Sequence, residues 1–94
     1  MGEPGTRTLV RRMALNRTEF LRSFPAAAGS LPWRVEGSRI LVEDAPRLLE
    51  ISLSPQSPRS MGALVLPQTD VSLRFEGFTT EAIDAFLRRF DLAF

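Results

Sequence analysis

The side chains that could do chemistry in this sequence are of few kinds. The chain of 94 residues contains no cysteine, histidine or tyrosine, and all twelve of its basic residues are arginine, so it also lacks lysine. General acid–base catalysis at neutral pH usually relies on histidine, or on a lysine or carboxylate with a shifted pKa. Metal sites lose their soft ligands without histidine and cysteine. Because carboxylates alone remain, we expect no enzyme activity, no cofactor and no metal site.

Two pairs of carboxylates are the candidates for catalysis by such groups. Glu43 is followed directly by Asp44, and Asp70 and Glu76 stand at the two ends of the run DVSLRFE. Paired carboxylates can hydrolyse glycosides or bind Mg²⁺. The first pair precedes Ala-Pro, which is typical of a solvated turn, and the second pair brackets an expected strand. Both pairs are therefore predicted to be ordinary surface charges.

The arginines are concentrated near the N-terminus. Residues 1–24 contain five arginines and two glutamates, five minus two or +3, whereas residues 25–94 contain seven arginines and nine acids, or −2. A basic segment of this kind could bind a nucleic acid or another polyanion. Its candidate residues are Arg7, Arg11, Arg12 and Arg17. Because the segment has no interleaved aromatic residues and no nucleic-acid-binding motif, polyanion binding is the alternative hypothesis and a solvated charged segment is the simpler interpretation.

Apolar residues at outward-facing positions indicate contact with a protein. In a sheet that is covered on one side only, the open face should be polar. The run MGALVL, residues 61–66, is apolar at positions of both faces, and four leucines, Leu41, Leu48, Leu64 and Leu66, would form an exposed patch if they met on the open face. Such a patch predicts self-association as a homodimer, or binding of another protein. Alternatively, the run is a central strand covered on both sides, or the strand register differs by one residue.

The first third of the chain predicts a tail, a strand and a helix. Residues 1–6 are rich in glycine and proline and are expected to form a disordered tail. Residues 7–15 alternate weakly between polar and apolar, which indicates a strand. Asn16 is typical of a helix N-cap, with Glu19 completing a capping box. Pro25 should kink or end that helix, although the AAAG that follows it could supply one more turn.

The middle of the chain predicts several strands. The runs 33–36 and 39–43 alternate and are joined by Gly37-Ser38, which suits a two-residue type II′ hairpin turn. The run RLLEISLS indicates a further strand, and SPQSPRS after it indicates a loop. MGALVL indicates a strand that stops at Pro67, and DVSLRFE follows as a strand with one apolar face.

The last segment predicts an amphipathic helix capped by Thr79 or Thr80. Apolar residues recur there with the period of a helix, in one stripe: Ile83, Phe86, Leu87, Phe90 and Phe94. A stripe at this spacing in a small domain is expected to be buried, so the phenylalanines are predicted to be core residues rather than a binding surface.

Together these elements predict an α+β protein, a single two-layer domain over residues 7–94. Its antiparallel sheet would have four to five strands, with both helices on one face, in the order β-α-β-β-β-β-α. This order resembles that of the repeat unit of TATA-binding-like folds, a likeness of element order that implies no site residue and no function. Without a signal peptide, a membrane-spanning run or cysteine, the chain is expected to be cytoplasmic. The expected function is a small, non-catalytic binding or interaction module that self-associates.

Overall fold

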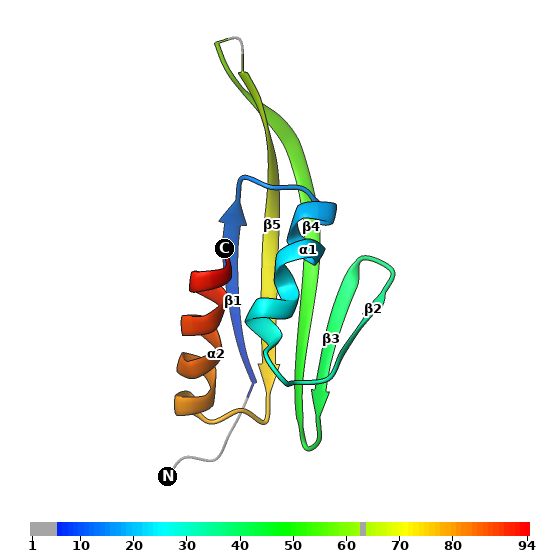
Figure 1. The fold of residues 1–94 in the computed structure, drawn as a ribbon, viewed down its shortest axis with the longest axis vertical. Coiled ribbons are helices and arrows are strands. Elements are labelled where there is room, and N and C mark those ends of the chain that lie inside the picture. Colours follow the sequence, from blue (N-terminus) through cyan, green and yellow to red (C-terminus); the bar gives the residue numbers. More distant parts are fainter. Residues whose placement is uncertain (1–5, 63) are drawn as a thin grey trace.

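The computed structural model describes the backbone of residues 6–62 and 64–94, and the side chains of these residues except 56–61 and 64–66. It contains five strands and two helices in the predicted order (Figure 1). The elements are β1 (Thr6–Met13), α1 (Arg17–Ala28), β2 (Trp33–Glu36), β3 (Arg39–Asp44), β4 (Arg47–Met61), β5 (Leu64–Glu76) and α2 (Thr80–Ala93). The predicted tail at residues 1–6 lies outside the described residues except for Thr6, which begins β1. No described helix has the length and apolar character needed to span a membrane.

The strands form one antiparallel sheet in the order β1-β5-β4-β3-β2. Both helices lie on the same face of this sheet (Figure 1), which confirms the predicted two-layer α+β architecture. The buried core forms between the helices and this face, and its largest side chains are Phe20, Phe24, Ile40, Val42, Leu49, Ile51, Val71, Leu73, Phe75, Phe86 and Phe90.

Phenylalanine rings join the two helices to each other. The ring centroids of Phe20 on α1 and Phe90 on α2 lie 6.2 Å apart, and those of Phe20 and Phe94 lie 4.7 Å apart. Phe75 on β5 packs edge-on against Phe86 at 5.8 Å. The prediction that the C-terminal rings are core residues is thus confirmed, because Phe86 and Phe90 of the helix stripe are buried and Phe94 packs against that core.

Helix α1 begins with the predicted capping box. The Asn16 side chain accepts a hydrogen bond from the Glu19 N–H, and the Glu19 carboxylate accepts one from the Asn16 N–H, each at 2.9 Å. The helix continues through Pro25 to Ala28 and ends at Gly29. Pro25 is tolerated because it lies in the last turn on the exposed side, where it removes one intrahelical hydrogen bond while Ala27 and Ala28 behind it are buried.

The capping box should contribute measurably to stability. We expect Asn16→Ala to lower the free energy of unfolding by about 1 kcal/mol, because the Glu19 N–H loses the Asn16 side chain as its acceptor. Urea denaturation followed by circular dichroism measures this loss. Thr18→Ala, an exposed change in the same turn, is the matched control and should leave the unfolding midpoint nearly unchanged. A midpoint for Asn16→Ala equal to that of Thr18→Ala would contradict the role of the cap.

The β2–β3 hairpin has the predicted turn. Glu36 pairs with Arg39, which leaves Gly37 and Ser38 as the two loop residues. Gly37 has φ 61°, and no described residue other than glycine has positive φ, so only the first loop position is left-handed. This is the type II′ pattern.

The β4–β5 hairpin is longer than the sequence predicts, and two predictions there are wrong. Residues 54–60, expected as a loop, belong to β4, and β5 does not stop at Pro67 but runs through it. The expected strand 61–66 is divided between the two strands, because Met61 ends β4 and Leu64 begins β5. The strand pairing shifts by one residue between Gln56 and Arg59, a β-bulge that accommodates the extra residue.

Pro55 and Pro67 fit inside these strands because their nitrogens face outward. The Leu53 N–H donates to the Ser38 carbonyl oxygen at 3.2 Å, on the β3 side of β4. Since successive N–H groups of a strand alternate between its sides, the Pro55 nitrogen also faces the β3 side, beyond the last β3–β4 pair. By the same alternation the Pro67 nitrogen faces the β1 side of β5. Neither proline therefore removes a hydrogen bond from the β4–β5 ladder.

Candidate functional site

The open face of the sheet, which the helices leave uncovered, is a set of ion pairs. Arg34 pairs with Glu36 at 2.7 Å and also with Glu43. On the neighbouring strands Glu50 accepts from Arg39 and lies 3.8 Å from Arg74. The opposite charges therefore alternate across the strands and largely neutralise one another. A face of this kind offers no excess of positive charge for a polyanion.

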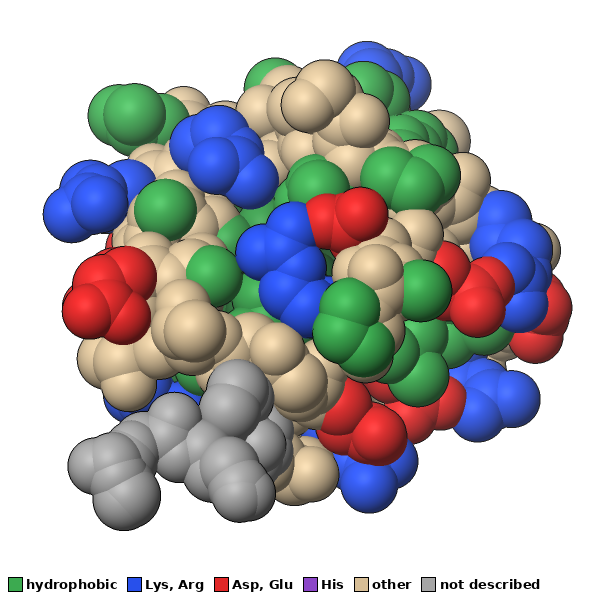
Figure 2. Space-filling view, turned by 90° about the horizontal axis from the view of Figure 1, so that it is seen from below, with side chains coloured by type: hydrophobic (Ala, Val, Ile, Leu, Met, Phe, Trp, Pro, Cys, Tyr) green, Lys and Arg blue, Asp and Glu red, His purple; other side chains and the backbone are tan. Residues whose placement is uncertain are grey.

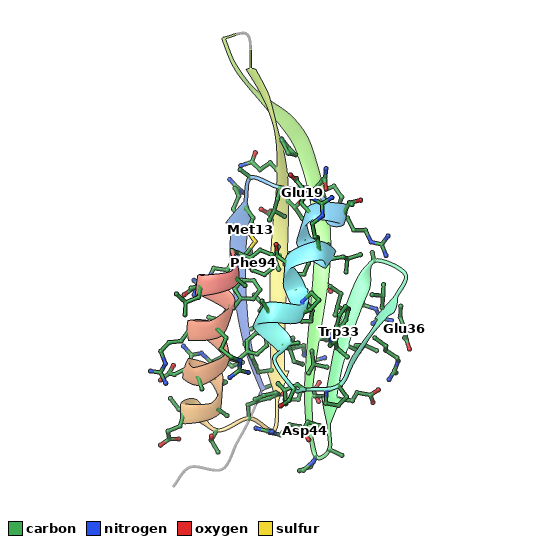
Figure 3. All side chains as sticks on the ribbon, in the orientation of Figure 1. Met13, Glu19, Trp33, Glu36, Asp44 and Phe94 are labelled. Carbon is green, nitrogen blue, oxygen red and sulfur yellow. The ribbon has the colours of Figure 1, made fainter. Side chains whose placement is uncertain are left out.

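All four carboxylates considered as catalytic candidates are paired with arginine. Glu43 pairs with Arg34 and Asp44 with Arg47, while Asp70 pairs with Arg12 at 2.9 Å and Glu76 with Arg74 at 3.1 Å. Asp44 lies at the end of the sheet where β3 turns into β4 (Figure 3), whereas Asp70 lies on β5. Among the described residues no group of acidic side chains could hold a metal ion.

The four predicted interface leucines fall in two separate places. Leu41 and Leu48 lie on the open face, where Leu41 is opposite Glu50 and Leu48 is opposite Glu43, so both half-buried side chains stand among charges. Leu64 and Leu66 belong to the distal part of the β4–β5 hairpin. Leu48 pairs with Glu76, ten residues along β5 from Leu66, which corresponds to about 33 Å. The structure thus brings Leu41 near Leu48 and Leu64 near Leu66, but it does not join them into one patch.

The four predicted polyanion-binding arginines do not gather either. Arg7 and Arg11 lie on β1 opposite Phe75 and Val71, on the helix-covered face, whereas Arg12 lies on the open face. Asp70 accepts a hydrogen bond from Arg12, and this bond and its charge raise the pKa of the guanidinium. Arg17, at the start of α1, donates to the Gly37 carbonyl oxygen at 2.8 Å, next to the β2–β3 turn. These contacts place Arg17 across the molecule from β1.

The most conspicuous feature that sequence reasoning missed is a projecting two-stranded arm, residues 56–62 and 64–68. The last pair of β3 with β4 is Arg39 with Ser52, and the last pair of β1 with β5 is Met13 with Thr69. Beyond these pairs, β4 and β5 pair only with each other over the part of the arm that the structure describes. The arm extends past both helices (Figure 1) and makes the molecule 51 Å long, against 24 Å and 23 Å in the other directions.

A hollow of about 430 Å³ lies where the arm meets the body. One wall is the start of α1, with Asn16, Arg17 and Thr18, and the other is the root of the arm, with Pro55, Pro67, Gln68 and Thr69. Thr69 anchors this root, because its buried hydroxyl donates to the Leu15 carbonyl oxygen at 2.7 Å. The arm therefore leaves the body from a fixed position beside an open hollow.

Comparison with family models, with curated proteins and with solved structures finds no match to this chain. Its function must therefore be inferred from its own residues.

Proposed function

We propose that this chain is a non-catalytic interaction module that self-associates through the β4–β5 arm. The observation that carries the proposal is the position of the apolar run MGALVL, whose described backbone, 61–62 and 64–66, lies at the far end of a ribbon that neither helix covers (Figure 1).

An arm of this composition is poorly suited to stand alone in water. Isolated two-stranded hairpins are only marginally stable, and they need a third strand or a packed layer. Three consecutive apolar positions, 64–66, follow the turn at Gly62, and the preceding residue is Met61. An apolar surface that a monomer leaves open usually marks a contact with another molecule. A partner on the arm would supply the missing layer.

The partner that the arm suits best is a second copy of the same arm. Between Gln56 and Gln68 the arm carries a single charged residue, Arg59, so no charge pattern favours a strongly charged partner. When two identical ribbons are related by a two-fold axis, each contributes the same residues to the contact. This is the usual geometry of homodimers. The nitrogens of Pro55 and Pro67 face the outer edges of the two strands. Because they carry no hydrogen to donate, they disfavour edge-to-edge pairing at the root of the arm. The two arms would therefore pack face to face.

The size of the arm indicates that the contact extends to the body. Gln68 lies six positions after Gly62 in the turn, so the arm is about 20 Å long, and two strands make it about 10 Å wide. A stable dimer usually buries about 1,200–2,000 Å² in total, which one face of such a ribbon does not reach. When two arms overlap fully in opposite directions, each tip lies at the root of the other. The hollow between α1 and Pro55 and Pro67 is open at that place.

The test is the molar mass of arm variants in solution. We expect the wild-type chain to elute from size-exclusion chromatography with light scattering at twice its chain mass of 10.5 kDa. Leu64→Glu and Leu66→Glu should each run at the single-chain mass, because a carboxylate in an apolar contact must be desolvated without a partner. Circular dichroism should show that both variants keep the wild-type fold.

The matched control is Leu92→Glu, because Leu92 is 89% exposed on α2, away from the arm, and should leave the dimer intact. A wild-type chain that runs at 10.5 kDa would refute the proposal, and so would arm variants that keep the doubled mass.

A further inference from the structure

A second hollow lies at the end of the molecule opposite the arm. It has a volume of about 330 Å³ and lies between the C-terminal end of α1, the first residue of β4 and the first turns of α2. Figure 2 looks at this end of the molecule, and apolar side chains form the floor of a depression near its centre, with basic side chains beside it. The volume is at the lower end of the range of small-molecule sites.

Most of the residues that line this hollow are apolar, and several of them are small. Phe78 and Phe86 are buried and form the floor together with Ala28. Ala82 and Ala85, on the side of α2 that faces α1, leave the space open where larger side chains would fill it. The hollow can therefore receive an apolar group of the size of a phenyl ring or a short alkyl chain.

Two guanidinium groups stand over the aromatic floor. The Arg47 guanidinium carbon is 5.0 Å from the centroid of the Phe78 ring, and that of Arg89 is 5.7 Å from the centroid of Phe86. Arg47 is paired with Asp44. Over the described ranges 6–62 and 64–94, no carboxylate lies within ion-pair distance of Arg89. The lining residues include no acid, so the hollow carries the uncompensated positive charge of Arg89.

The Nε–H of Arg89 holds its side chain in position, and its terminal Nη groups make no ion pair with a described carboxylate. Its Nε–H donates to the Ala27 carbonyl oxygen at 3.2 Å, at the C-terminal end of α1, where a positive charge is favourable. This contact fixes the guanidinium beside the hollow and leaves its Nη groups available. A guanidinium of fixed orientation is the geometry that binds a carboxylate through two hydrogen bonds.

We propose that this hollow binds a small carboxylate that carries an apolar group. The apolar group lies against Ala82 and Ala85, above the buried rings of Phe78 and Phe86, and the carboxylate accepts hydrogen bonds from Arg89, with Arg47 as the second cation. Neither half of such a ligand suffices alone, because the floor offers no polar partner and Arg89 offers no apolar surface of its own. The class includes aryl carboxylates and short fatty acids.

The test is a titration followed by the amide signals of the ¹⁵N-labelled full chain, with benzoate as the probe. We expect saturable shifts at Gly29, Ala82, Ala85 and Arg89. Acetate, which lacks the ring, and benzyl alcohol, which lacks the charge, should each bind at least tenfold more weakly. Equal shifts with all three probes, or no saturable shifts with benzoate, would overturn the proposal.

Variants separate the site from a general effect of charge. Arg89→Gln should weaken benzoate binding at least tenfold, whereas Arg88→Gln, an exposed neighbour on α2, should leave it unchanged. Because Arg89→Gln also removes a contact to α1, Ala85→Leu is the second variant. It keeps both arginines but fills the hollow, and it should abolish binding. Wild-type affinity in either Arg89→Gln or Ala85→Leu would overturn the proposal. The hollow is at the opposite end from the arm, so the result does not depend on self-association.

Discussion

Replacing Phe90 by alanine should lower the free energy of unfolding by about 3–5 kcal/mol. The Phe90 side chain is fully buried, and its ring centroid lies 6.2 Å from that of Phe20, 6.0 Å from that of Phe86 and 4.7 Å from that of Phe94. Removing the ring leaves a cavity where α1 and α2 meet, and the surrounding rings can collapse into it only in part. Domains of this size have about 5–15 kcal/mol of stability, so the loss is a large fraction of the total.

Urea denaturation measures this effect, and the chain supplies its own reporter. The single tryptophan, Trp33, packs edge-on against Phe24 of α1, with ring centroids 5.1 Å apart, so its fluorescence follows the packing of the helix layer. Leu92→Ala is the matched control on the same helix and should change stability by less than about 0.5 kcal/mol. All variants are compared at one protein concentration, because association would couple to unfolding. A loss below about 1 kcal/mol for Phe90→Ala would mean that the ring is not packed as described.

The parts of the fold that could be predicted are those with local signals. Asn16 and Glu19 form a cap whose geometry depends on four consecutive residues. Gly37-Ser38 predicts a two-residue hairpin turn, because a type II′ turn needs a left-handed residue at its first loop position and glycine adopts that conformation readily. The apolar stripe of α2 has one period over the whole helix, and its burial follows from that period. In each case the cause lies within one element.

The arm could not be predicted because the effect of a proline on a strand depends on where the neighbouring strands end. A proline inside a strand usually argues against that strand. Pro55 and Pro67 are compatible with β4 and β5 only because β3 and β1 end before them, so that no ladder hydrogen bond is lost. The lengths of β1 and β3 depend on other parts of the chain. A signal was present in MGALVL, whose apolar positions on both sides of a glycine suit two strands around a turn.

The candidate surfaces were harder to predict than the fold, because they depend on how strands far apart in the sequence pair with one another. Leu41 and Leu66 both belong to runs that read as strands, and nothing in the sequence shows that β5 extends far beyond the body. The hollow beside Arg47 and Arg89 was not predicted at all. Arg47 and Arg89 are 42 positions apart and come together only because β4 begins beside the C-terminal end of α1.

Gly77→Ala is the second substitution with a large expected effect, about 2–5 kcal/mol of lost stability. Gly77 connects β5 to the turn before α2 with φ 76°, a left-handed conformation that costs other residues about 1–2 kcal/mol. A Cβ at this position would lie 3.1 Å from the Pro46 carbonyl oxygen and 3.5 Å from the Arg47 Cα. These neighbours are backbone atoms of the β3–β4 turn, which cannot move aside as a side-chain end can, so crowding adds about 1–3 kcal/mol.

Gly37→Ala separates the two causes, because Gly37 has a similar φ of 61° but no described atom lies within 4 Å of the place that a Cβ would take. It should cost only the conformational part, about 1–2 kcal/mol. Urea denaturation of both variants gives the difference, which is the contribution of the close approach between the β5–α2 connection and the β3–β4 turn. Equal losses would show that this approach is looser than described. A larger loss of stability for Gly77→Ala than for Gly37→Ala would show that the contact between Gly77 and the β3–β4 turn fixes the position of α2, and with it that of Arg89.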